Sequence, residues 1–298
     1  MTIPGKILSE KQQAQFWRDG YVIVDGAVDA KTLTLLRQQM DDWAAESRGH
    51  AEPYGPPTVD GRPRFDLEEN HSPDRPALRR INNPAEISDV FHAVMTDAPM
   101  VDMVADLIGP DVKYHHCKIN SKLPGSQMVV HYHQDFPYTP HTNDDVITAL
   151  LLLDDVDVGN GCLMVVPGTH KGTIGSLFQD GVFTGKVNPA LEQDYLARQV
   201  PIEGKAGAVC LMHTRLAHGS EPNPSKTRRR AIYLCVYSAA DAIPIARNPM
   251  PSKFEGTIVR GRASATARMI PLQVELPQQP KSASFFTVIG QKSASSGA

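Results

Sequence analysis

The 298-residue sequence has no long apolar run, no surplus of either charge and few cysteines. Apolar runs such as residues 149–153 fall far short of the roughly 20 residues that cross a bilayer, and residues 1–15 lack the apolar stretch of a signal peptide. The 30 Lys and Arg residues nearly balance the 33 Asp and Glu residues, so no nucleic acid or anionic membrane is expected as a partner. The composition therefore excludes membrane, collagen-like, coiled-coil and disulfide-stapled secreted classes.

The four cysteines are Cys117, Cys162, Cys210 and Cys235, and no two of them form a CxxC pair. Each lies in an apolar or strand-like segment, which favours buried thiols that act as small hydrophobic side chains. Their spacing fits neither a zinc site nor a disulfide framework. We therefore expect a reducing compartment, the cytoplasm.

Hydrophobic spacing is helical in most of the first 110 residues. Ser9 and Gln12 have the spacing of a capping box, which predicts a helix to about Arg18. A second helix is expected after Asp29, and Pro99 divides the periodic stretch 85–108 into two helices. Residues 49–84 are rich in proline, glycine and charge, and they are expected to form a long irregular loop.

From residue 112 to about residue 240 the sequence pattern is mainly strand-like. A short helix is expected near 189–198, and the segment after 240 is expected to be an irregular extension, with residues 291–298 disordered. Short strands joined by turns, without alternating helices, predict a mainly β sandwich or barrel with flanking helices. We expect one domain over 1–298, with helices in 9–110, a β core at about 111–240 and an extension at 241–298. The expected strands are 112–120, 127–135, 146–153, 162–166, 207–213 and 231–238.

One strand-like stretch holds the residue types of a metal site. His131, His133 and Asp135 alternate in sequence, so their side chains are expected on one face of a strand. His133 and Asp135 on the interior of a barrel, with one further His from a distant strand, would form a facial set of two imidazoles and a carboxylate. That set suits non-haem Fe(II), because it leaves positions open for a co-substrate and O2.

Three ordered blocks carry a resemblance to a known family. They are HQDFPY at 133–138, GNGCLMVVPGTHKG at 159–172, and HGS at 218–220 with an arginine eleven residues after its histidine. The segment FWRDGYVIV at 16–24 also looks like that family's opening helix and strand. The sequence resembles the phytanoyl-CoA dioxygenase family of Fe(II)/2-oxoglutarate-dependent oxygenases from about residue 9 to 240.

The resemblance implies a double-stranded β-helix, a cupin-like jelly-roll barrel. It also implies that His133, Asp135 and His218 bind the iron. His218 is preferred to His213, whose context is that of a strand residue, and His131 is interpreted as a pocket or core residue.

The resemblance also assigns the co-substrate. Arg229 stands at the family's spacing and would bind the distal carboxylate of 2-oxoglutarate, because a guanidinium binds a carboxylate through two parallel hydrogen bonds. Ser220 and Asn120 are expected to line the same pocket. Arg228 and Arg230 are expected to face away from it. Near Leu150 this chain is aliphatic where some family members carry a bulky aromatic residue.

The implied activity is hydroxylation of an unactivated C–H bond of a small organic molecule, with O2 consumed and succinate and CO2 released. Tyr132, Tyr138 and His141 are expected to line the substrate pocket, and one of His115 and His116 can face it. Desaturation, epoxidation or ring closure by the same chemistry remain open, as does a CoA-linked substrate held by residues 226–230. A metal-binding jelly roll without catalysis is the rival class, while a zinc hydrolase is disfavoured because no general base accompanies the ligands.

Overall fold

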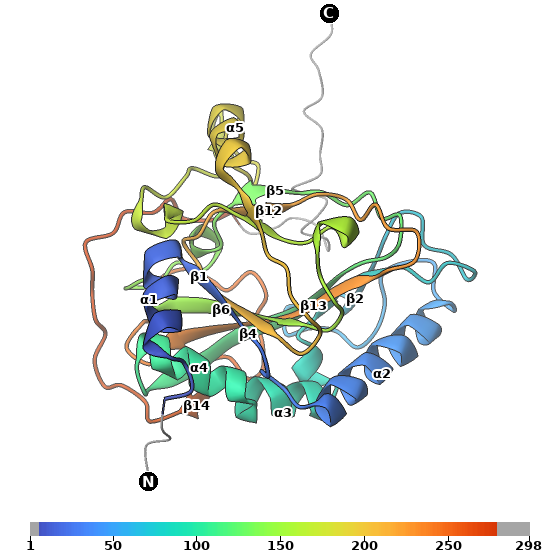
Figure 1. The fold of residues 1–298 in the computed structure, drawn as a ribbon, viewed down its shortest axis with the longest axis horizontal. Helices are drawn as coiled ribbons and strands as arrows, with labels where there is room; N and C mark the ends of the chain where they lie inside the picture. The colour runs from blue at the N-terminus through green and yellow to red at the C-terminus, as the bar shows by residue number, and fades with distance from the viewer. Residues whose placement is uncertain (1–5, 279–298) are drawn as a thin grey trace, which may run out of the picture.

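The computed structural model describes residues 6–278, in which two antiparallel sheets enclose the interior of a jelly roll (Figure 1). The larger sheet has the order β1 (Tyr21–Val24), β11 (Val209–His213), β6 (Val146–Leu152), β13 (Arg230–Ala239), β4 (Val112–Lys122), β3 (Leu78–Asn82) and β2 (Phe65–Leu67), and β14 (Ile258–Arg260) also pairs with β4. The smaller sheet has the order β10 (Val200–Pro201), β7 (Met164–Val165), β12 (His218–Ser220) and β5 (Val130–His133). A separate hairpin joins β8 (Phe178–Gln179) and β9 (Val182–Phe183).

Four helices cover the outer face of the larger sheet: α1 (Glu10–Asp19), α2 (Ala30–Ser47), α3 (Asp89–Asp97) and α4 (Pro99–Ile108). A fifth, α5 (Pro189–Arg198), lies on the opposite side of the molecule (Figure 1). The predicted capping box of Ser9 and Gln12 is confirmed, and Pro99 begins α4 as expected. Four short 3-10 helices are η1 (Pro84–Glu86), η2 (Phe136–Tyr138), η3 (Val158–Asn160) and η4 (Thr169–Lys171).

Strand β6 shows why part of the sequence has no alternating pattern. All seven of its residues are buried, because both faces of the larger sheet are covered. Ala149 and Leu151 pack into the core beneath the helices, whereas Leu150 and Leu152 pack into the core between the two sheets. The apolar run is therefore one strand shared by two cores.

The expectation of an irregular loop over 49–84 is wrong for its second half. Strands β2 and β3 lie there and extend the larger sheet beyond β4. The charged residues in these strands obscure the strand pattern in the sequence. Arg79 forms an ion pair with Asp66, whereas Arg80 lines the interior cavity. A buried polar face gives no hydrophobic alternation, so the sequence pattern fails here.

The main strands and α5 lie close to their predicted ranges, and the four cysteines are buried and free. Beyond 240, β14 is an additional short strand in the segment expected to be irregular. The predicted disorder of 291–298 falls outside the described residues. Among residues 6–278, no helix combines the length and apolar character needed to cross a membrane.

Candidate metal centre and its cavity

Two paired strands of the smaller sheet bring the three expected ligands together. His133 ends β5, Asp135 begins the turn into η2, and His218 opens β12 directly opposite His133. Oδ1 of Asp135 lies 3.6 Å from Nε2 of His133 and 3.7 Å from Nε2 of His218. The three ligand atoms all lie within 4.8 Å of one another, the arrangement of a facial metal site.

Hydrogen bonds hold both imidazoles in the orientation that a metal ligand needs. Nδ1 of His133 donates to the carbonyl of His131 at 2.8 Å, and Nδ1 of His218 donates to the carbonyl of Leu216 at 3.0 Å. The proton is therefore assigned to Nδ1 in each ring, which leaves the lone pair of Nε2 facing the shared point. Burial, assisted by His133, lowers the pKa of His218 to about 4, so this imidazole is neutral near pH 7.

Asp135 is held in its ionised form. Burial alone would raise its pKa, but His218 and His133 outweigh burial and hold the pKa well below its usual range. Its second oxygen accepts a hydrogen bond from the Thr148 hydroxyl at 3.2 Å. Two imidazole nitrogens and one carboxylate oxygen fit a divalent iron ion in donor type.

Two adjoining chambers meet at these ligands. Both are lined by Arg80, Lys118, His133, Asp135 and Leu234. The first, which we call the aliphatic chamber, has a volume of about 630 Å³, part of it open to solvent. Its other lining residues are Asn120, Met128, Val130, Leu150, Leu163, Met212, His218, Ser220, Arg230 and Ile232.

The aliphatic chamber contains a buried cation that suits a carboxylate. Arg230 is 4 % exposed, and its Nε has no hydrogen-bond partner within residues 6–278. Burial lowers its pKa to about 10, so it stays charged. Ser220 already accepts a hydrogen bond from Lys122 at 2.7 Å, which leaves its own proton to donate. Asn120 accepts one from Arg80 at 3.3 Å and keeps its amide N–H groups for the chamber.

The structure corrects the expected placement of the arginines. Arg229 points away from the chamber and donates to both oxygens of Asp154, at 2.9 and 3.2 Å, and to Asp41 at 3.0 Å. Arg230, the first residue of β13, lines the chamber instead. Arg228, as expected, faces outward and pairs with Asp157.

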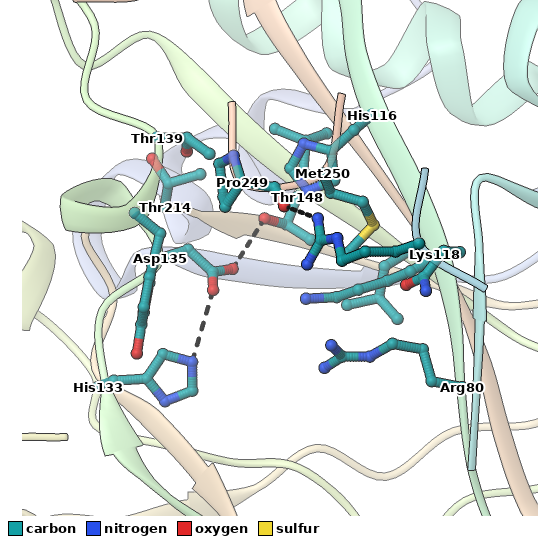
Figure 2. Close-up of a pocket in the computed structure, with 15 residues that line it drawn as sticks. Arg80, His116, Lys118, His133, Asp135, Thr139, Thr148, Thr214, Pro249 and Met250 are labelled. Carbon is teal, nitrogen blue, oxygen red and sulfur yellow. Dashed lines mark hydrogen bonds and ion pairs between the residues drawn. The ribbon is translucent and has the colours of Figure 1, made fainter. Parts of the chain in front are cut away.

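The second space, which we call the polar chamber, has a volume of about 710 Å³, part of it open to solvent. Figure 2 shows Arg80 and Lys118 facing His133 and Asp135 across it. Burial and the neighbouring Arg80 lower the pKa of Lys118 to about 8. Its other lining residues are Arg62, Asn82, His116, Tyr138, Thr139, Thr148, Thr214, Val236, Pro249 and Met250.

Of the three residues expected in the substrate pocket, Tyr138 alone lines this chamber. Tyr132 is corrected: it neighbours His133 on β5, points to the other face and packs against Tyr195. His141 is also corrected, since it lies outside both linings, with its ring 5.1 Å from that of His115. His116 is the member of its pair that faces the chamber, as the alternation required.

Several lining residues were missed by sequence reasoning. Lys118 and His116 lie two and four residues before Asn120 on β4, so the inward assignment of Asn120 already implied both. Arg80 and Asn82 alternate in the same way on β3, which pairs with β4. They were missed because no strand was predicted there.

A jelly roll that converges two imidazoles and a carboxylate on one point, beside a buried arginine, defines the class of iron- and 2-oxoglutarate-dependent oxygenases. Comparisons with known proteins agree. The family model for phytanoyl-CoA dioxygenase matches residues 16–231. The chain therefore belongs to the phytanoyl-CoA dioxygenase family, and it is an enzyme whose cofactors are iron, 2-oxoglutarate and O2.

Relatives of different named activities share its sequence. It is 29 % identical over 273 residues to a probable alpha-ketoglutarate-dependent hypophosphite dioxygenase of Stutzerimonas stutzeri, covering 90 % of this chain and 91 % of that protein. It is 25 % identical over 248 residues to human peroxisomal phytanoyl-CoA dioxygenase, covering 80 % and 71 %. The solved structure of EctD from S. alaskensis with bound Fe shares the fold, with a TM-score of 0.67, 21 % identity and coverage of 91 % and 90 %.

Proposed function

We propose that this protein hydroxylates a small molecule, R–H, according to R–H + 2-oxoglutarate + O2 → R–OH + succinate + CO2. One observation carries the proposal. The metal triad and an inward-facing buried arginine line the same aliphatic chamber, as a chelating dicarboxylate requires. A jelly roll that merely stored a metal ion would have no use for a buried arginine in the same chamber.

The triad would hold the iron. His133 and His218 present Nε2, and Asp135 presents Oδ1, within 3.6 and 3.7 Å of those two nitrogens. Iron bound there supplies the activation of O2 that is coupled to decarboxylation of 2-oxoglutarate. The Thr148 hydroxyl fixes the free oxygen of Asp135, so the carboxylate keeps one orientation.

Arg230, in place of the expected Arg229, would bind the distal carboxylate of 2-oxoglutarate. The Ser220 hydroxyl and the Asn120 amide stand in the same chamber as further donors. Leu150, Met212 and other aliphatic side chains exclude water around the chain of the co-substrate, which strengthens these hydrogen bonds. The aliphatic Leu150 leaves room where a bulky aromatic would stand.

The substrate would occupy the polar chamber, with Tyr138 in its wall. The basic segment 226–230 does not offer a site for the phosphates of a CoA ester, because Arg228 and Arg229 already pair with carboxylates and Arg230 faces inward. The similarity to the S. stutzeri protein over 90 % of this chain supports a small, free substrate.

The test is a visible spectrum recorded without oxygen, since Fe(II) chelated by 2-oxoglutarate gives a weak charge-transfer band. Wild type should show the band, and His218→Ala should lose it because iron binding weakens by more than about 100-fold. Circular dichroism should show that the variant is folded. A wild type that binds Fe(II) but shows no band, and forms no succinate in air, would support the non-catalytic binding module instead.

A further inference from the structure

Besides Arg62, two cations line the polar chamber, and they lie on neighbouring strands. Arg80 lies on β3 and Lys118 on β4, in the strand pair whose register places Arg80 opposite Asn120 and Asn82 opposite Lys118. Both side chains point toward the metal triad across the chamber (Figure 2). They are therefore placed to contact whatever lies beside the metal.

Carboxylates pair with Arg62 and Arg79 beside this chamber, but none in the described part of the chain pairs with the ammonium group of Lys118. Asp60 pairs with Arg62, and Asp66 accepts two hydrogen bonds from Arg79. The side chain of Lys118 makes no hydrogen bond or ion pair with any residue in the described range 6–278. A partly buried ammonium without a partner is costly unless a ligand supplies the counter-charge.

The charges of the catalytic assembly balance without Lys118. A divalent metal ion and Arg230 carry three positive charges, and Asp135 with doubly ionised 2-oxoglutarate carries three negative ones. Asp135 is the sole carboxylate that lines either chamber within residues 6–278. Lys118 therefore adds a positive charge to the chamber lining that this assembly does not balance, and a neutral substrate would not balance it either.

We propose that Lys118, assisted by Arg80, is the substrate-binding residue for an anionic group, so the substrate is a small carboxylate or phosphorus oxyanion whose oxidised bond lies close to that group. The inference rests on the proposed function and names the substrate class of the same site. A short distance from anionic group to metal follows from the geometry, because Lys118 and Arg80 line both chambers at the point where these meet.

A role of Lys118 in holding 2-oxoglutarate is the competing assignment. The donors for the distal carboxylate, Arg230 and Ser220, line the aliphatic chamber and are absent from the lining of the polar one. Lys118 is shared with the polar chamber, on the substrate side. The experiment separates the two roles by measuring co-substrate and anion affinities independently.

The experiment titrates the anaerobic enzyme, loaded with Fe(II) and 2-oxoglutarate, with three probes: hypophosphite, butyrate and neutral butyramide. Binding is followed by the shift of the charge-transfer band, which needs no turnover. The variants are Lys118→Met, Lys118→Arg and, as a matched control on the same strand, Lys113→Met, whose residue lies outside both linings.

We expect at least one anion, but not butyramide, to shift the band of wild type. Lys118→Met should weaken the binding of that anion by about 10- to 100-fold, and Lys118→Arg should restore most of the affinity. Lys113→Met should bind the anion as wild type does. The affinity for 2-oxoglutarate should stay within about 2-fold in every variant. Comparison of the affinities for butyrate and hypophosphite then shows whether the site prefers a carboxylate or a phosphorus oxyanion.

Three results would overturn the proposal: no anion shifts the wild-type band, butyramide binds as well as butyrate, or Lys118→Met loses 2-oxoglutarate affinity instead of anion affinity. Each leaves the band of wild type intact, so the proposed function would survive. Absence of the band from wild type itself contradicts the proposed function, and this outcome is distinct from the other three.

Discussion

The two chambers differ in how they handle charge, although they share a wall. To the shared Arg80 and Lys118 the aliphatic chamber adds a further arginine, Arg230, among aliphatic side chains, as a site for a known dicarboxylate requires. To the same two shared cations the polar chamber adds Arg62 and hydroxyls such as that of Thr148. The first chamber is thus specialised for one ligand of fixed length. The second sets the charge of its ligand and leaves its shape to the surrounding loops, including Pro249 and Met250.

The largest effect is expected at Arg230, which tests whether the aliphatic chamber is the site for 2-oxoglutarate. Arg230→Ala should weaken the binding of 2-oxoglutarate by about 100-fold, because two charge-assisted hydrogen bonds are lost in a water-poor chamber. Arg229→Ala is the matched control, since its side chain contacts Asp154 and Asp41 outside the chamber. The measurement is the dependence of the charge-transfer band on 2-oxoglutarate concentration at saturating Fe(II).

Arg229→Ala should bind 2-oxoglutarate within about 2-fold of wild type. The reverse result, with Arg229→Ala impaired and Arg230→Ala normal, would return the role to Arg229 and contradict the orientation of β13. Equal losses in both variants would indicate a structural effect on the strand rather than a contact with the co-substrate.

A buried lysine, Lys122, sharpens the comparison through pH. Its Nζ contacts Ser220 and the carbonyl of Glu221 beyond the aliphatic chamber, and burial together with Arg230 lowers its pKa to about 6. The unfolded chain binds this proton up to about pH 10.5, so between pH 6 and 10 the unfolded state holds more protons. Stability should therefore rise with pH, by about 1 kcal/mol per pH unit from this group.

The measurement is urea unfolding of the metal-free protein at pH 6 to 9, for wild type and Lys122→Met. The gain in stability of wild type relative to the variant should grow steadily across this range. Parallel curves would mean that Lys122 keeps an ordinary pKa in the folded state, most simply because water reaches its ammonium.

Much of the fold could be predicted from the sequence, because helix and strand periods depend on local burial. The Ser9 capping box, the break at Pro99 and strands β4, β6, β11 and β13 follow from such patterns. Strands β2 and β3 could not be predicted, because polar residues such as Arg80 and Asn82 on β3 line the cavity. The hydrophobic alternation that identifies a strand is absent where inward-facing residues are polar for a functional reason.

The metal triad could be predicted from motif order, whereas the arginine could not. The spacing from His218 selects Arg229, but a strand turns adjacent side chains to opposite faces, and the start of β13 decides which one enters. Asp154 determines which arginine enters the chamber. It accepts a hydrogen bond from Arg229, which holds that side chain outward, and another from the backbone N–H of Ala231. The sequence alone does not show that Asp154 lies there.

The smallest expected effect is on the stability of the metal-free protein, where the two neighbouring arginines should behave in opposite ways. Arg229→Met leaves Asp154, which is nearly buried, without two of its donors and should cost about 1–2 kcal/mol of unfolding free energy. Arg230→Met removes a buried charge whose Nε has no partner within residues 6–278, so it should leave stability unchanged or raise it. Urea unfolding at one pH measures both. If Arg230→Met is as destabilising as Arg229→Met, Arg230 is a structural cation, and the contrast between a charge kept for a ligand and a charge kept for the fold fails at this strand.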